Sequence, residues 1–202
     1  MIRFSSNAKI YFLIKIALFY FIFAFNSYSD NSIVTLGSDK APVKIKVYSS
    51  LTCPHCASFH INIIPEIKKE YIEKGKVQLI FIDFPLDQMA FNASKLLYCV
   101  DKKKQISYLD TIYETQNKWT VGTNLEDVNN NLKKIVKNLG ISSSQFDTCL
   151  VDDVISDKIL NLRIEAHKEY SIDSTPTIVI NEKKLKGSAS LNNIIKRIEK
   201  II

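Results

Sequence analysis

The 202-residue sequence contains only five glycines, five prolines and four cysteines, and it has no internal repeat. So little glycine and proline excludes collagen-like and low-complexity disordered chains, and the lack of a repeat excludes solenoids and propellers. Four cysteines are too sparse for a small disulfide-dense scaffold. The remaining composition, 46% hydrophobic and 24% charged, is typical of a globular chain of one domain.

Arginine and the common nucleotide-binding motifs are also scarce. Only three of the 27 basic residues are Arg, and the other 24 are Lys. Because bidentate recognition of phosphates and bases favours Arg, we expect no nucleic-acid partner. No Gly-rich phosphate loop, H-E-x-x-H or G-x-S-x-G motif occurs, so nucleotide-binding, zinc-protease and hydrolase functions have no support. We interpret the lysine runs at 102–104 and 183–184 as solvated surface.

The first 29 residues have the pattern of a secretory signal peptide. A basic start leads into an apolar stretch at 10–25 that only Lys15 interrupts, and Ser, Tyr and Ser follow at 27–29. The stretch is shorter than the about 20 apolar residues that a membrane span needs. We expect residues 1–29 to be cleaved after export. Lys15 and the bulky Tyr28 leave an uncleaved anchor as the alternative, and either outcome exports the protein.

Hydrophobic periodicity predicts an α/β protein with a helical insertion. A strand at 43–47, a helical segment after Thr52 and a strand at 77–84 form an N-terminal half at 30–86, whose residues 30–41 read as a polar lead-in. Strands at 177–180 and 184–186 and a helix from Ser190 form a C-terminal half at 171–202. The insertion at 87–170 shows no strand, and its predicted helices are 88–100, 106–118, 125–139, 145–150 and 154–170.

The motif Cys53-Pro54-His55-Cys56 is the most specific chemical signal in the sequence. It follows a predicted strand and opens a predicted helix, which is the context of a redox-active C-x-x-C pair. Free backbone N–H groups and the helix dipole would then stabilise a Cys53 thiolate, while Cys56 can close a disulfide behind it. His55, when protonated, adds positive charge and favours an oxidising couple. Pro54 suits the first turn of a helix.

A zinc site is the alternative for the same two cysteines. Zinc takes four ligands, commonly from a second C-x2-C or an H-x3–5-H pair. His60 lies four residues after Cys56 and His167 lies far along the chain, but no second tight pair occurs. We therefore favour redox chemistry over metal binding, and we predict no metal and no other cofactor.

The other two cysteines, Cys99 and Cys149, lie 50 residues apart in two different predicted helices. They are either buried free thiols, a common state for this residue type, or a structural disulfide. An oxidising compartment favours the disulfide. The bridge needs Cα atoms within about 7 Å and would add about 3–4 kcal/mol to stability by constraining the unfolded chain. We expect this bridge, with a structural and not a catalytic role.

The order of these elements resembles the DsbA-like branch of thioredoxin-fold proteins. Three stretches carry the resemblance, namely IKVYSSLTCPHCASFH at 45–60, FIDFPLD at 81–87 and STPTIVIN at 174–181. The resemblance extends over residues 43–202. It implies a thioredoxin fold that is interrupted by an all-helical insertion.

The resemblance also implies a role for each matching residue. Cys53 would form the mixed disulfide with a substrate, and Cys56 would be the buried resolving thiol. Pro176 would be a cis-proline that faces the site, and Thr175 would present its backbone to the substrate by strand-like pairing. Many family members carry an acid six residues before the first cysteine. This chain has Val47 there, which bears on the rate of resolving and not on the type of reaction.

We therefore expect an exported, monomeric DsbA-like dithiol:disulfide oxidoreductase of a Gram-negative-type periplasm. It would donate its disulfide to reduced or unfolded exported proteins and be reoxidised by a membrane quinone-linked partner. The alternatives are a disulfide reductase or isomerase, a non-catalytic metal-handling module, and a chaperone that grips unfolded chains. Isomerases of this fold usually add an N-terminal dimerisation domain, and only 13 residues separate Ser29 from the first predicted strand.

Overall fold

The computed structural model describes residues 33–202, so the predicted signal peptide lies outside the described residues. The fold is built on a five-stranded sheet in the order β1-β3-β2-β4-β5. β2 and β3 run parallel, and the other neighbouring strands run antiparallel. The strands are β1 (Val34–Leu36), β2 (Val43–Ser49), β3 (Val77–Asp83), β4 (Thr177–Ile180) and β5 (Lys183–Lys184).

Alternating apolar side chains explain why the central strands form where they do. On β2, Ile45 and Val47 belong to the core on one face of the sheet, and Tyr48 belongs to the core on the other. On β4, Ile178 and Val179 are divided between the two cores in the same way. Successive strand residues point to opposite faces, so each of these strands is stabilised by burial on both sides.

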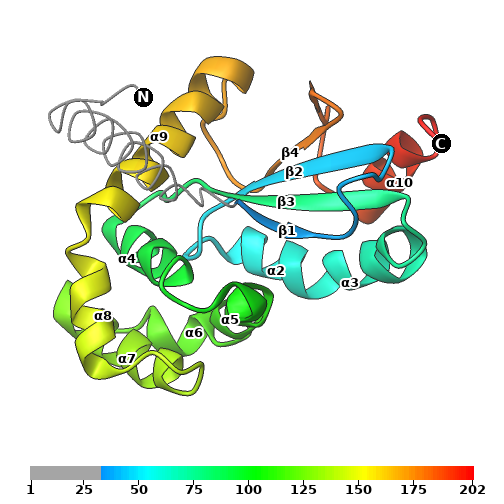
Figure 1. Cartoon of the computed structure of the whole chain (residues 1–202). Helices are drawn as coiled ribbons and strands as arrows, with labels where there is room; N and C mark the ends of the chain where they lie inside the picture. The colour runs from blue at the N-terminus through cyan, green and yellow to red at the C-terminus, as the bar shows by residue number, and fades with distance from the viewer. Residues whose placement is uncertain (1–32) are drawn as a thin grey trace, which may run out of the picture. The chain divides into compact units, whose positions relative to one another are not determined.

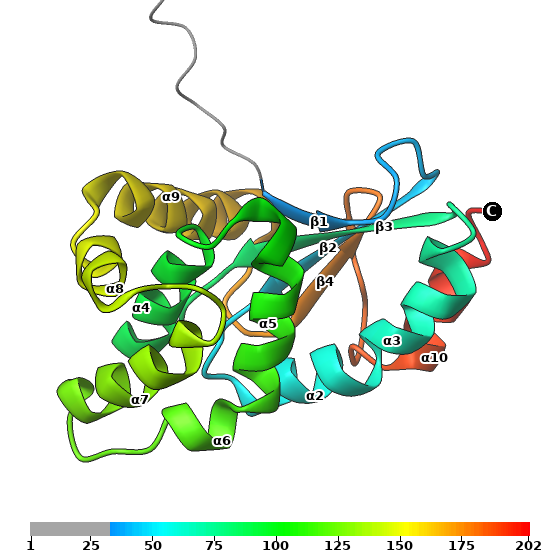
Figure 2. The same ribbon diagram turned by 60° about the horizontal axis from the view of Figure 1, so that its bottom comes forward.

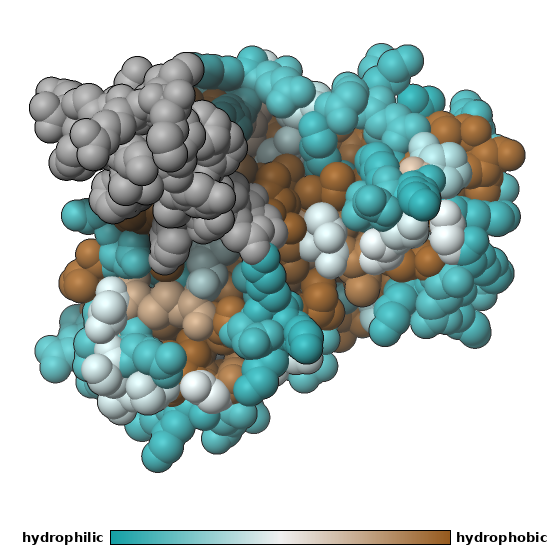
Figure 3. All heavy atoms as spheres, viewed as in Figure 1, coloured by the Kyte–Doolittle hydropathy of each residue, from teal (hydrophilic) through white to brown (hydrophobic). Residues whose placement is uncertain are grey.

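Helices cover both faces of the sheet (Figure 1). One face packs against α2 (Pro54–Asn62), α3 (Ile64–Ile67), the π-helical turn η1 (Lys68–Ile72) and α10 (Leu191–Ile198). The other face packs against α9 (Asp153–Tyr170), through Ala166. No helix within residues 33–202 is long and apolar enough to cross a membrane. Figure 3 shows hydrophobic side chains across the middle of one face, with many hydrophilic ones around them.

Between β3 and β4 the described chain contains helices joined by loops and no strand, which confirms the predicted fold class of an α/β protein with a helical insertion. Figure 2 shows α4 to α8 gathered beyond one end of the sheet. Besides α9, this part contains α4 (Gln88–Leu97), the 3₁₀ turn η2 (Lys102–Lys104), α5 (Gln105–Glu114), α6 (Gln116–Trp119), α7 (Leu125–Lys137) and α8 (Ser143–Leu150).

Two predicted boundaries in the strand regions are wrong. Residues 30–41 were expected to lack a strand, but β1 lies within them. Three residues are too few to show alternation, and β1 exists because it pairs with β3. The last strand begins at Lys183 and not at Lys184, because Asn181 and Glu182, with φ of 43° and 61°, form a two-residue hairpin turn directly after β4.

The helix predicted at 106–118 is in fact two helices, α5 and α6, which meet at Thr115. The hydroxyl of Thr115 donates to the carbonyl of Thr111 at 2.6 Å, and its backbone φ and ψ of −104° and 13° leave the helical region. Neither Gly nor Pro marks this break, which is why the periodicity did not indicate it. After this break, α6 contacts the loop that follows β2, at Leu51 and Cys53.

A disulfide joins Cys99 to Cys149 on α8, with Cα atoms 6.4 Å apart. The predicted helix at 88–100 includes Cys99, but α4 ends at Leu97. Cys99 therefore lies in the turn after the helix. The bridge spans 50 residues of sequence, which include α5, α6 and α7. It therefore joins the turn before α5 to α8, which follows α7.

We expect the double variant Cys99→Ala/Cys149→Ala to lose about 3–4 kcal/mol of unfolding free energy, because the unfolded chain regains the freedom of this loop. Urea denaturation of the two oxidised proteins measures the difference. After reduction of the disulfides in both proteins, wild type and the variant should have the same unfolding free energy. A loss below about 1 kcal/mol would show that the bridge constrains little.

Asp83, the last residue of β3, is a buried carboxyl that connects the sheet to α4. Its two oxygens accept hydrogen bonds of 2.6 Å from the hydroxyls of Ser94 and Tyr98. Burial raises the pKa of Asp83, and these two hydrogen bonds oppose the rise. The folded protein therefore holds the Asp83 proton more tightly than the unfolded chain does, whose Asp pKa is about 3.9.

This raised pKa predicts the sign of a pH effect on stability. The contribution of Asp83 to the unfolding free energy is fully present below about pH 4. It is lost as pH rises through the pKa of Asp83 in the folded protein. The unfolding free energy of wild type minus that of Asp83→Asn should therefore fall as pH rises from about 4. Urea denaturation at a series of pH values tests this. A difference that grows with pH would mean that the ionised carboxylate is the stabilised form.

Candidate active site

Cys53 is the N-cap residue of α2. Its backbone is extended, with φ of −76° and ψ of 118°, and its Sγ accepts a hydrogen bond from the backbone N–H of Cys56 at 3.3 Å. Pro54 lies in the first turn, where the N–H that proline lacks would have no helical partner. The helix thus begins directly at the motif. Its N-terminus, with free N–H groups and the positive end of the dipole, lies at the Cys53 sulfur.

The two thiols of the motif are unequal. Both are free in this structure, but Cys53 is 8% exposed and Cys56 only 1%. Burial raises the pKa of the Cys56 thiol to about 12, and the Thr175 hydroxyl and the Ser50 backbone partly offset the rise. A molecule arriving from solvent therefore meets Cys53 first, and Cys56 is protonated at neutral pH.

The segment before β4 completes the surroundings of the sulfur atoms. The Thr175–Pro176 peptide bond is cis, and the Cys53 thiol donates to the carbonyl oxygen of Thr175 at 3.4 Å. The Thr175 hydroxyl is buried and has no hydrogen-bond partner among residues 33–202. An unpaired buried hydroxyl costs about 1–3 kcal/mol. Because this one faces Cys56, it is placed to donate to a thiolate when Cys56 loses its proton.

Polar groups of the helical insertion hold the loop that carries the motif. Gln116 of α6 donates from Nε2 to the carbonyl oxygens of Leu51 at 2.8 Å and of Cys53 at 3.2 Å. Thr52 donates to a carboxylate oxygen of Asp87, the N-cap of α4, at 2.6 Å. Sequence reasoning missed these positioning residues. The only available signal was Asp87 as a helix-cap residue, and nothing in the sequence distinguishes Gln116.

A buried aromatic cluster lies next to Cys56. The rings of His60 and Tyr113 are 4.7 Å apart, and His60 Nε2 bonds to a carboxylate oxygen of Asp110 at 2.7 Å. Burial and then the charge of Cys56 raise the pKa of Tyr113. The sequence indicated a packing aromatic and a satisfied histidine, without placing either beside Cys56. Val47 is buried in β2, so no carboxyl group occupies that position.

A pocket of about 440 Å³ adjoins the motif. It is lined by His55, Ser58, Phe59, Ile63, Thr175, Pro176 and residues 187–190. His55 is exposed, and this lining combines backbone, small hydroxyls and apolar side chains, which suits an extended peptide. The structure therefore brings all four residues of the motif together with Thr175 and Pro176. Among residues 33–202, no three His, Cys, Asp or Glu side chains gather as metal ligands.

The geometry can be compared with known proteins. The thioredoxin family model matches residues 29–200. The chain is 33% identical over 153 residues to a probable disulfide bond formation protein D of Bacillus cereus, an alignment covering 73% of this chain and 69% of that relative. The chain thus spans about two thirds of that relative's length.

Solved structures show the same likeness. The crystal structure of Wolbachia pipientis alpha-DsbA1 is 31% identical with a TM-score of 0.76, covering 84% of this chain and 90% of that one. The crystal structure of oxidised BdbD from Bacillus subtilis is 25% identical with a TM-score of 0.72, covering 85% and 94% of the two chains. The likeness therefore extends over more than four fifths of this chain.

The buried state of Cys56 predicts how its reactivity depends on pH. In the variant Cys53→Ser, Cys56 should react with iodoacetamide at a rate that rises about tenfold per pH unit, with no plateau below about pH 9, because only the thiolate reacts. Mass spectrometry of the alkylated protein measures the rate, with Cys56→Ser as the matched variant. A plateau near neutral pH would contradict the burial that the structure shows.

Proposed function

Because this chain belongs to the thioredoxin family, as a DsbA-like thiol:disulfide oxidoreductase, we propose that it works as an oxidase which donates the Cys53–Cys56 disulfide to exported proteins. One observation carries the proposed direction. The Cys53 sulfur caps α2 and accepts the N–H of Cys56 at 3.3 Å. A helix N-terminus that stabilises the thiolate stabilises the reduced enzyme, and a stabilised reduced form makes a strong oxidant.

The exchange proceeds in two balanced steps. A substrate thiolate attacks Cys53 Sγ of the oxidised enzyme, the Cys53–Cys56 bond breaks, and Cys56 leaves and takes up a proton. A second substrate thiolate then attacks the substrate sulfur of the mixed disulfide, and Cys53 leaves as a thiolate at the N-terminus of α2. The substrate loses two electrons and gains a disulfide, and the enzyme ends as the dithiol.

The buried Cys56 favours completion of this sequence. If its thiolate attacked Cys53 in the mixed disulfide, the substrate would be released still reduced. With the Cys56 pKa raised to about 12, the attacking thiolate is scarce at neutral pH. The mixed disulfide therefore persists until the second substrate thiol reacts. The Thr175 hydroxyl gives the Cys56 thiolate a donor during its brief formation in the first step.

The neighbouring residues would hold the substrate. The pocket at the motif accommodates an extended chain, with Thr175 pairing by its backbone and Pro176 shaping the surface beside Cys53. Main-chain pairing gives affinity without dependence on sequence, as an enzyme with many substrates requires. His55, exposed at the pocket, adds positive charge near the sulfur when it is protonated.

We place this activity in a periplasm-like compartment. The signal-peptide pattern at 1–29 and the disulfide between Cys99 and Cys149 support this placement, since such bridges persist outside the reducing cytosol. Reduced enzyme would return to the disulfide form by passing two electrons to a membrane quinone-linked partner. The enzyme would act as a monomer on reduced or unfolded exported proteins.

A direct test mixes oxidised enzyme with a reduced two-cysteine peptide in the absence of any other oxidant. We expect one peptide disulfide to form for each enzyme dithiol produced, and we expect Cys53→Ser to form none. Cys99→Ala/Cys149→Ala is the matched control and should retain the exchange, because its active-site pair is intact. If reduced enzyme instead reduces the oxidised peptide while oxidised enzyme leaves the reduced peptide unchanged, the protein is a reductase.

A further inference from the structure

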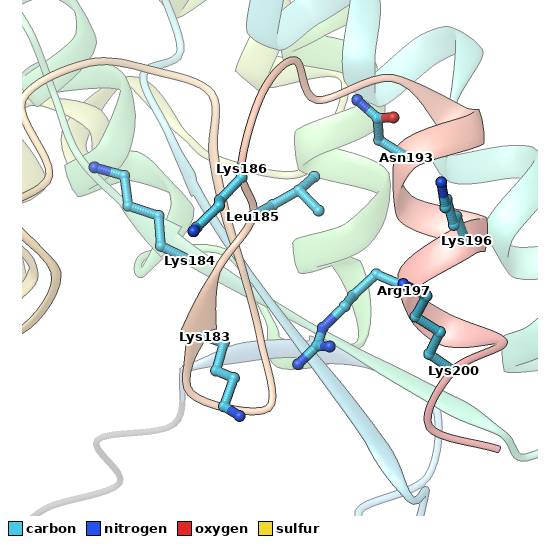
Figure 4. A pocket seen from close by; sticks show the side chains of 8 residues that line it. All are labelled: Lys183, Lys184, Leu185, Lys186, Asn193, Lys196, Arg197 and Lys200. Atoms are coloured by element: carbon cyan, nitrogen blue, oxygen red, sulfur yellow. The ribbon is translucent and has the colours of Figure 1, made fainter.

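A second pocket, of about 450 Å³, lies between the β4–β5 hairpin and α10 and is lined mainly by cations (Figure 4). Its cations are Lys183, Lys184, Lys186, Lys196, Arg197 and Lys200, and no acidic residue lines it. Like charges in one concave surface repel each other unless an anion neutralises them. The pocket is therefore a candidate site for a negatively charged partner.

The two glutamates nearest in sequence are bonded elsewhere. Glu182 accepts a hydrogen bond from Lys46 at 2.7 Å and another from Tyr170. Glu199 accepts from the hydroxyl of Tyr71 at 2.6 Å. Within residues 33–202, none of the pocket's six cations forms an ion pair with a carboxylate. Their charge is consequently available to a ligand.

The charge of the described chain is concentrated at this place. Residues 183–202 contain six cations and one acid, whereas residues 33–182 contain 18 cations and 19 acids. Lysines on an edge strand can have the simple role of preventing the strand from pairing with another chain. That would account for Lys183 and Lys184, the latter of which donates to the Ser171 carbonyl at 3.1 Å. It does not account for the three cations on α10 and in the segment just after it.

The cations of α10 and of the segment after it follow the period of one helix face. Asn193, Lys196, Arg197 and Lys200 are spaced i, i+3, i+4 and i+7, which gives a stripe about 10 Å long. Figure 4 shows Arg197 reaching from α10 toward the hairpin, where Lys183 lies. Cations from two elements thus border one groove.

This basic pocket is a neighbour of the pocket at the active site. Asn193, which lines the basic pocket, donates from Nδ2 to the carbonyl of Ser188 at 3.1 Å, and Ser188 lines the pocket at the motif. Lys186 belongs to the basic pocket and lies two residues before Ser188. A chain that leaves the active site along α10 would therefore pass over the cations.

We propose that the basic pocket binds acidic segments of substrate polypeptides, so that the enzyme preferentially oxidises cysteines that lie several residues from clustered Asp and Glu. This proposal rests on the proposed function. The nearness of the basic pocket to the active site, through Asn193 and Ser188, favours a peptide over a free anion or a membrane surface. Lysine ammonium groups act as mobile point charges, which suits carboxylates at variable positions. Three extended residues cover about 10 Å and match the stripe.

The test compares three two-cysteine peptides. Each ends in three identical residues, either Asp, Asn or Lys, and the peptides are otherwise the same. A spacer of about six residues, roughly 20 Å when extended, separates these residues from the cysteines. Oxidised wild-type enzyme should oxidise the Asp peptide about tenfold faster than the Asn peptide at about 0.01 M ionic strength. The preference should nearly vanish at about 1 M, where charges are screened beyond about 3 Å.

Charge-neutral variants locate the effect. Lys196→Gln/Arg197→Gln/Lys200→Gln should reduce the Asp-to-Asn rate ratio to below about twofold. Lys103→Gln/Lys134→Gln/Lys137→Gln removes the same charge from the helical insertion and should keep the ratio of wild type. An equal fall of the Asp-to-Asn rate ratio in both triple variants would show that net charge alone causes the preference, and it would overturn the proposal.

Two further outcomes separate the inference from the proposed function. If wild type oxidises all three peptides equally, the acidic-segment proposal fails while the oxidase function stands. If it oxidises none, the proposed function fails. Sedimentation with phosphatidylglycerol vesicles tests whether the pocket instead binds an anionic membrane. Vesicle binding that the α10 triple variant abolishes, together with equal peptide rates, would make the pocket a membrane-contact surface and overturn the proposal.

Discussion

The hydrogen bond from the backbone N–H of Cys56 to the Cys53 sulfur, at 3.3 Å, is the interaction on which the chemistry of this protein depends. It exists because Cys53 is the last residue before α2 and takes the place that a serine or aspartate side chain often holds at a helix start. The N-terminus of the helix favours negative charge there. In the proposed oxidase, this favours the reduced enzyme, so that the oxidised enzyme passes its disulfide to other thiols.

Segments far apart in the sequence keep this cap in place. β2 delivers the loop, Gln116 of α6 holds two of its carbonyl groups, and the carbonyl of Thr175 contacts the Cys53 sulfur from the entry of β4. The helical insertion therefore contributes directly to the active site. The same arrangement buries Cys56, so one thiol is presented to partners and the other is withheld.

Much of this could be predicted from the sequence, because its strongest signals are local. Period-2 alternation predicted β2, a short apolar run predicted β4, and the C-x-x-C spacing between a strand and a helix indicated the candidate redox pair. The missed features depend on tertiary contacts. β1 exists only through its pairing with β3, the break at Thr115 occurs without Gly or Pro, and the proximity of Tyr113 to Cys56 follows from packing of α5 on α2. No pattern of residue types encodes those three.

The reduction potential of the Cys53–Cys56 pair tests the central claim most directly. Equilibration of the mature chain with glutathione buffers, with the Cys99–Cys149 bridge intact, gives this value. A helix cap that stabilises the Cys53 thiolate predicts a potential close to about −120 mV, as in DsbA. A potential close to about −270 mV, in the range of thioredoxin, would contradict it, because the reduced enzyme would then donate electrons to its partners.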